Sequence, residues 1–146
     1  MFKRVLLCHD GSDAARKALK HGAELAIELR AHVDVLLIIS PSAADAAVTA
    51  ASVGAACLVN SEIEFSRILK ESIARLKSRG IDANGYLAQG PQIEVIAQHA
   101  RKLSTDLIVV GHYPRSAGGR WWSGADRSSL AESVSCSVLI AQGDGG

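Results

Sequence analysis

The stretch "DLIVVGH", residues 106–112, is the plainest candidate in this sequence for a strand buried on both faces. Its apolar residues follow one another without the alternation that marks a half-exposed strand. Similar runs occur at residues 4–9 and 32–40, and shorter strands are expected within 82–90 and at 137–142. Such runs are typical of parallel sheets covered by helices on both faces, so the sequence predicts five strands of this kind.

Amphipathic helical patterns separate these runs. Apolar residues recur at helical spacing over residues 13–30, 61–79 and 91–103, and a short helix is expected across about 126–135. Regular alternation of strand and helix predicts a single doubly wound α/β domain, with a five-stranded parallel sheet and helices on both faces, of Rossmann-like type. We expect the domain to span residues 1–142, followed by a disordered tail at 143–146.

Residues 42–59 stand apart from this pattern, because they are mostly Ala, Ser and Val and carry one charge. We interpret them as a loop that runs into a weak helix.

Composition narrows the class of protein. The chain has 146 residues, of which 48% are hydrophobic and 21% charged, as expected of one globular domain. A net charge of +1 argues against a partner that is nucleic acid or an anionic membrane. The three cysteines form no CxxC or Cys/His cluster, so we predict neither a disulfide framework nor a metal site. A cytoplasmic protein is expected.

Two strand ends carry residues suited to a nucleotide. Asp10 follows the first strand, where a carboxylate accepts hydrogen bonds from ribose hydroxyls or an adenine amine; a simpler interpretation is that it caps the turn. Gly111 ends the fourth strand, where a glycine lets a sugar or phosphate approach the backbone, although a plain turn would also explain it. His9 and His112 end strands that we expect to be close, which raises a weaker hypothesis of pH sensing or metal binding.

The loop after the fourth strand is rich in glycine and arginine. Gly118, Gly119 and Gly124 are suited to form a nest of N–H groups for phosphate, and Gly124 precedes a helix N-terminus. Arg115 and Arg120 are suited to bidentate phosphate contacts. The alternative interpretation is that these three glycines and two arginines belong to a solvated surface loop. Neither a P-loop motif nor a dinucleotide fingerprint occurs.

The chain resembles the universal stress proteins over essentially its whole length. Three stretches carry the resemblance: "RVLLCHDGSDAARKAL" (4–19), "DLIVVGHYPR" (106–115) and "AESVSCSVLIA" (131–141). In nucleotide-binding members the loop has Gly, two residues, Gly, nine residues, Gly, then Ser or Thr. This resemblance implies the Rossmann-like fold, a homodimer, and ATP or AMP as the ligand of a retained site that includes Asp10, Gly111 and Gly124.

Two positions depart from that pattern: Pro114 replaces the second glycine and Ala125 replaces the Ser or Thr. Proline has no N–H and a fixed φ, and alanine has no hydroxyl. A hydrogen bond to a charged group is worth about 1.5–3 kcal/mol, so losing two weakens binding about a hundredfold or more. We therefore expect a dimeric stress-response regulator that binds ATP weakly or not at all.

Two other functions remain open. One is an ATP- or AMP-binding switch with at most slow hydrolysis, in which Arg115 and Arg120 compensate for the two departures. The other is an interaction module that docks through residues 42–59 and through Trp121 and Trp122. No nucleophile with an evident base is present, so we predict no strong catalytic activity.

The last strand is apolar on both faces. If this strand lies at the sheet edge, pairing with its copy in a second chain would cover it. We predict an antiparallel homodimer through residues 136–142, with these residues at the interface: Val138, Leu139, Ile140 and Ala141.

Overall fold

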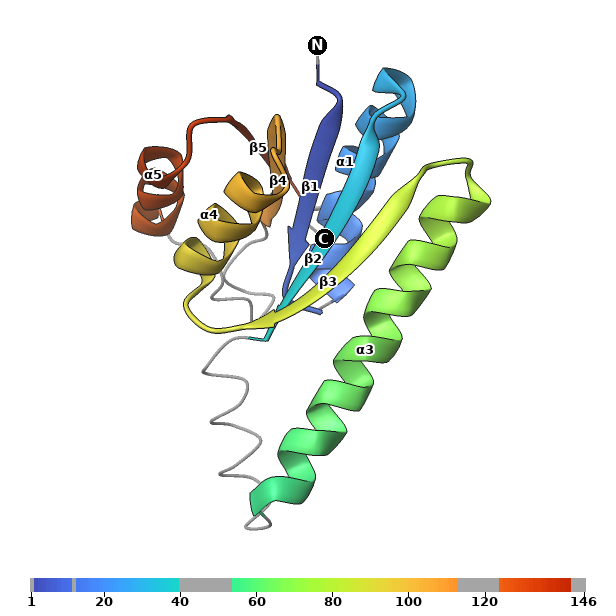
Figure 1. Ribbon diagram of the computed structural model, residues 1–146, viewed down its shortest axis with the longest axis vertical. Coiled ribbons are helices and arrows are strands. Elements are labelled where there is room, and N and C mark those ends of the chain that lie inside the picture. The colour runs from blue at the N-terminus through green and yellow to red at the C-terminus, as the bar shows by residue number, and fades with distance from the viewer. Residues whose placement is uncertain (1, 12, 40–53, 113–123, 143–146) are drawn as a thin grey trace.

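The structure is a computed structural model that describes residues 2–11, 13–39, 54–112 and 124–142. Its five strands form one parallel sheet in the order β3-β2-β1-β4-β5, which confirms the predicted fold class (Figure 1). The strands are β1 (Arg4–His9), β2 (His32–Ile39), β3 (Ala83–Gln89), β4 (Leu107–His112) and β5 (Ser137–Gln142). The helices are α1 (Asp13–Leu29), α3 (Gly54–Ser78), α4 (Gln92–Lys102) and α5 (Gly124–Ser133).

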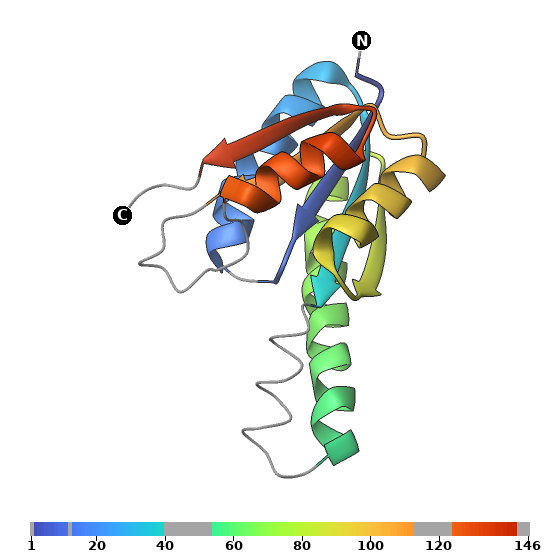
Figure 2. The same cartoon turned by 90° about the vertical axis from the view of Figure 1, so that its left-hand side faces the viewer.

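Helices cover both faces of the sheet. α1 and α3 lie on one face and α4 and α5 on the other (Figures 1 and 2). Alternate residues of β1 therefore enter two separate cores, with Val5 and Leu7 facing α1 and α3, and Leu6 and Cys8 facing α4 and α5. Helices shield both faces of β1 from water. Its side chains on both faces are therefore apolar, which explains the unbroken apolar run in the sequence of β1.

The crossover helix α3 is longer than predicted. It begins at Gly54, whereas the apolar stripe predicted a start at Ser61. Its amino-terminal turns extend beyond the carboxyl ends of the strands (Figures 1 and 2). The stretch "GAACLVN" at 54–60 has no proline and no amphipathic stripe, so its helicity gives no periodic signal. Part of the 42–59 segment is thus regular helix, and residues 40–53 lie outside the described residues.

The carboxyl end of α3 is the one that the sequence predicted. Gly80 has a φ of +82°, as expected of a C′ glycine. The Gly80 N–H donates to the Lys77 carbonyl at 3.0 Å, and the Ile81 N–H donates to the Leu76 carbonyl at 3.1 Å. This Schellman motif packs Ile81 and Leu76 into the same core and turns the chain into β3.

In the part of the chain described, the helices are too short or too polar to cross a membrane. Cys8 is buried and Cys136 half-buried, and both are free thiols. Burial raises the pKa of the Cys8 thiol far above its usual range, and the nearby Cys136 acts in the same direction. Cys8 is therefore an unreactive core residue.

Candidate nucleotide site at the carboxyl edge of the sheet

The sheet reverses its strand order between β1 and β4. From β1 the chain moves outward to β2 and β3, then returns to the other side of β1 to form β4. Ligands of doubly wound sheets bind outside the carboxyl ends of the strands at such a switch point. The register pairs Cys8 with Val110, so Asp10 and Gly111 follow these residues at the same edge. Two of the residues predicted for the site are thus close together.

A third predicted residue, Gly124, is the first residue of α5. Since α5 connects two parallel strands, it runs against them and begins at their carboxyl edge. Its unpaired N–H groups and helix dipole make that end favourable for an anion. Asp10, Gly111 and the start of α5 therefore share one edge of the domain.

The remaining loop predictions concern residues 113–123, which lie outside the described residues. They include Arg115, Gly118, Gly119 and Arg120, together with Pro114, Trp121 and Trp122. Ala125 is the second residue of α5, but its side chain is also outside the description.

The turn after β1 is built on His9, a residue that sequence reasoning did not assign to the site. His9 is 3% exposed, and the Gly11 N–H donates to its Nδ1 at 3.0 Å. Burial lowers the pKa of His9 to about 4; the charge of Asp10 raises it and that of Arg16 lowers it. The imidazole is therefore neutral at physiological pH. A sensor of physiological pH would have to titrate in that range, so the pKa of His9 argues against the pH-sensing hypothesis.

Metal binding finds no support in the described residues, where no three His, Cys, Asp or Glu side chains are grouped closely enough to hold an ion. The side chain of His112, the other half of the proposed pair, lies outside the description.

Side chains of α3 pack against the turn that follows β1. Gly11 has a φ of +88°, and a Cβ at this position would lie 2.7 Å from Cε1 of Phe65 and 3.7 Å from Cδ1 of Ile68. A side chain at Gly11 would therefore be strained and would also clash. Phe65 belongs to the predicted apolar stripe of α3, but only the tertiary structure reveals that it closes the turn beside Asp10.

Comparison with known proteins decides the family. The model of the universal stress protein family matches residues 1–142. The chain belongs to the universal stress protein family. Universal stress protein YxiE of Bacillus subtilis (strain 168) is 28% identical over 152 residues, covering 97% of this chain and 100% of that protein.

Solved universal stress proteins share the fold. One, in complex with cAMP, superposes with a TM-score of 0.67 at 23% identity, covering 97% of each chain. Another, from Archaeoglobus fulgidus in complex with dAMP, has a TM-score of 0.62 at 16% identity and covers 97% of this chain and 98% of its own. These likenesses confirm the Rossmann-like universal stress protein fold.

One further feature of this universal stress protein escaped the sequence reasoning. One cleft is lined by Arg16 and Lys20 of α1, by Arg75 of α3, and by Arg79, the residue that follows α3. The two residues of each pair are four apart in sequence, a spacing that places them on the same side of a helix. This spacing can be recognised from the sequence alone. Joining the two pairs required knowing that both helices cover the same face of the sheet.

Proposed function

We propose that the protein is a stress-response regulator with an altered nucleotide site that binds ATP weakly or not at all. The observation that carries the proposal is the pair of departures from the family's loop pattern, Pro114 and Ala125. We further propose that it acts in the cytoplasm and without catalysis.

The physical argument concerns the phosphates. The start of α5 at Gly124 still offers backbone N–H groups and a favourable dipole. Pro114 offers no N–H in the loop, and Ala125 offers no hydroxyl beside the helix N-terminus. The adenosine end of the site, with Asp10 and Gly111, is unaffected by these changes. The expected result is a site that keeps its shape for a nucleoside but loses affinity for its phosphates.

A second candidate is an ATP- or AMP-binding switch. It is favoured by the two solved relatives in complex with cAMP and dAMP, which show that proteins of this fold hold adenine nucleotides. In this alternative Arg115 and Arg120 supply charge-assisted contacts in place of the missing ones. Asp10 would bind the nucleoside in the same manner.

Calorimetric titration with ATP and AMP separates the two candidates. We expect little heat from the natural chain, and a gain of about a hundredfold in ATP affinity in the double variant Pro114→Gly/Ala125→Ser. Adding Asp10→Ala to that double variant should abolish the restored binding, which controls for binding elsewhere on the surface.

Two outcomes would contradict the first of these candidate functions. Tight ATP binding by the natural chain that is lost in Asp10→Ala would establish the switch instead. An unchanged affinity in the double variant would show that the loop departures do not weaken the site.

We also infer that two copies of the chain pair through β5. In support, β5 is an edge strand, and Leu139 within it is 36% exposed, whereas Ala141 is buried by its own chain. An open, largely apolar edge favours pairing with a second strand. Antiparallel pairing over residues 136–142 would place Val138 and Ile140 at the interface together with Leu139.

A further inference from the structure

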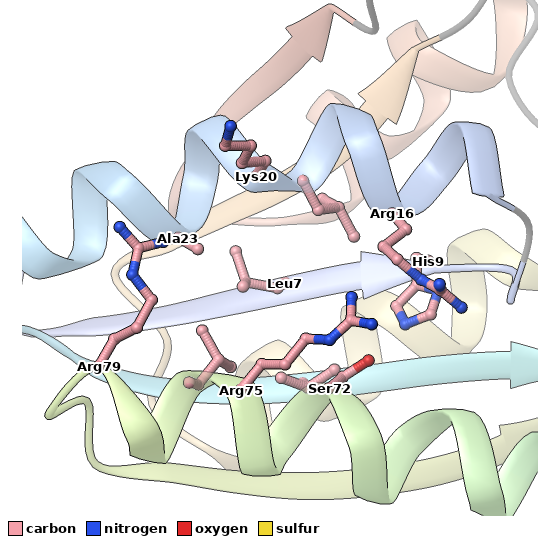
Figure 3. Close-up of a pocket in the computed structure, with 11 residues that line it drawn as sticks. Leu7, His9, Arg16, Lys20, Ala23, Ser72, Arg75 and Arg79 are labelled. Carbon is pink, nitrogen blue, oxygen red and sulfur yellow. The ribbon is translucent and has the colours of Figure 1, made fainter.

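The cleft lies between α1 and α3, on the face of the sheet that these helices cover. It has a volume of about 160 Å³, and five of its eleven lining residues are apolar (Figure 3). The apolar residues come from β1, β2, α1 and α3: Leu7, Leu19, Ala23, Val35 and Leu76. Neither Asp10 nor Gly111 of the candidate nucleotide site lines it.

Cations border this cleft, and none of its lining residues in the described part of the chain is a carboxylate. α1 contributes Arg16 and Lys20, α3 contributes Arg75, and Arg79 follows directly after the end of α3. Figure 3 shows Arg75 and Arg79 extending across the cleft toward α1, while Arg16 lies beside His9. Arg75 and Arg79 thus lie over the apolar lining residues rather than pointing away from them.

Arg75 and Arg79 at the cleft differ from Arg67, which lies earlier in α3. Arg67 is paired with Glu64 and Glu71. Within the described residues, Arg75 and Arg79 have no carboxylate within ion-pair distance. Two neighbouring cations such as Arg75 and Arg79, with no carboxylate beside them, disfavour the compact state and produce a field that attracts anions. The charge pattern therefore calls for an anionic occupant.

We propose that this cleft binds a small amphiphilic anion, with an apolar body about the size of a benzene ring and a carboxylate or phosphate head. A cavity of about 150 Å³ lined by aliphatic side chains is known to hold benzene, so the volume fits such a body. Guanidinium groups bind carboxylate and phosphate through two parallel hydrogen bonds, and Arg75 and Arg79 are placed to do so. This activity is separate from nucleotide binding and does not depend on the proposed function.

The test is a titration of the isotope-labelled full chain followed by amide NMR shifts. Phenyl phosphate and benzoate serve as probes for the two kinds of head group, and benzyl alcohol and inorganic phosphate serve as controls for the body and the head alone. We expect shifts at cleft residues such as Leu7, Leu19 and Val35. Each control should bind about tenfold more weakly or worse, because it lacks one half of the interaction.

A matched pair of variants identifies the cations. Arg75→Gln/Arg79→Gln should lower the affinity for phenyl phosphate about tenfold or more. Lys70→Gln/Lys77→Gln removes the same charge from exposed positions of α3 outside the cleft and should leave the affinity nearly unchanged. Equal losses in the two variants, equal binding of benzyl alcohol, or shifts confined to Asp10 and Gly111 would each overturn the proposal, as would the absence of cleft shifts at millimolar probe.

Discussion

The backbone N–H of Gly11 donates a hydrogen bond to Nδ1 of His9, with 3.0 Å between the two nitrogens. This bond requires an unprotonated Nδ1, so the neutral ring carries its proton on Nε2. Because His9 is buried, protonating the ring would place a charge in the core, and the pKa falls to about 4. The turn that presents Asp10 thus depends on a neutral histidine.

This arrangement predicts that the protein loses stability in mild acid. The pKa of His9 is lowered from 6.5 to about 4 by folding, so the unfolded chain binds the proton first as pH falls. The contribution is complete above pH 6.5 and is lost progressively toward pH 4, with a cost of about 2 kcal/mol between pH 7 and pH 5. Urea unfolding at several pH values measures it.

The matched control for this pH effect is a pair of histidine variants. An Asn side chain at position 9 can still accept from the Gly11 N–H but does not titrate, so His9→Asn should flatten the pH dependence. His21→Asn, in an exposed position of α1, should leave the slope close to that of the natural chain. A slope that persists in His9→Asn would assign the acid sensitivity to another group.

Gly22 lets α1 approach the sheet closely. A Cβ at this position would lie 2.7 Å from Cγ1 of Val109 and 3.0 Å from Cδ2 of Leu7. We expect Gly22→Ala to lower the free energy of unfolding by about 1–3 kcal/mol, even though alanine favours helix. Adding Val109→Ala should make the Gly22→Ala change less costly, which a double-mutant cycle in urea detects. A stabilised single variant would contradict this packing.

Gly80 has a different requirement, because no atom lies within 4 Å of a Cβ built there. Its cost on substitution comes only from the φ of +82°. Gly80→Ala should therefore destabilise the fold by about 1–2 kcal/mol, and Gly80→Asn by less, since asparagine tolerates this conformation better. Thermal unfolding of the two variants gives the order, and a larger loss for Asn would refute the backbone explanation.

A buried carboxylate at the opposite edge of the sheet makes an asymmetric prediction. Asp34 is wholly buried, and its carboxylate is 3.1 Å from Nη2 of Arg4 and 3.0 Å from Nε2 of His32. Arg4→Leu leaves that charge with one partner fewer and should cost about 3 kcal/mol. Asp34→Leu should cost less, because the Arg4 side chain is 40% exposed and can be solvated. The double variant should recover most of the Arg4→Leu loss, and simple additivity would argue against the coupling.

The parts of the fold with strong local signals were predictable from sequence. The run at 106–112 and its companions identified a covered parallel sheet, because strands with two dry faces have unbroken apolar sequences. Gly80 identified the end of α3, because only a residue tolerant of positive φ fits there. A weak helix was expected within residues 42–59, but its start at Gly54 was not located, since a helix without an apolar stripe has no periodic signature.

The candidate site was only partly predictable for a related reason. Asp10 and Gly111 share an edge because parallel strands end together, which follows from strand order alone. The neutral state of His9 and the contact between Gly11 and Phe65 depend on burial and packing between segments far apart in sequence. Such tertiary effects leave no pattern in the local sequence.

The last prediction concerns the proposed dimer, for which the sheet offers a matched control. Leu139 in β5 and Leu87 in β3 lie in the two opposite edge strands, and each is 36% exposed. A lysine in an edge strand opposes pairing with a second chain, so Leu139→Lys should shift the protein to monomer in sedimentation at micromolar concentration. Leu87→Lys makes the same change in charge and hydrophobicity as Leu139→Lys, but in the opposite edge strand, and should leave the dimer intact. A natural chain that sediments as a monomer, or dissociation by Leu87→Lys instead, would rule out pairing through β5.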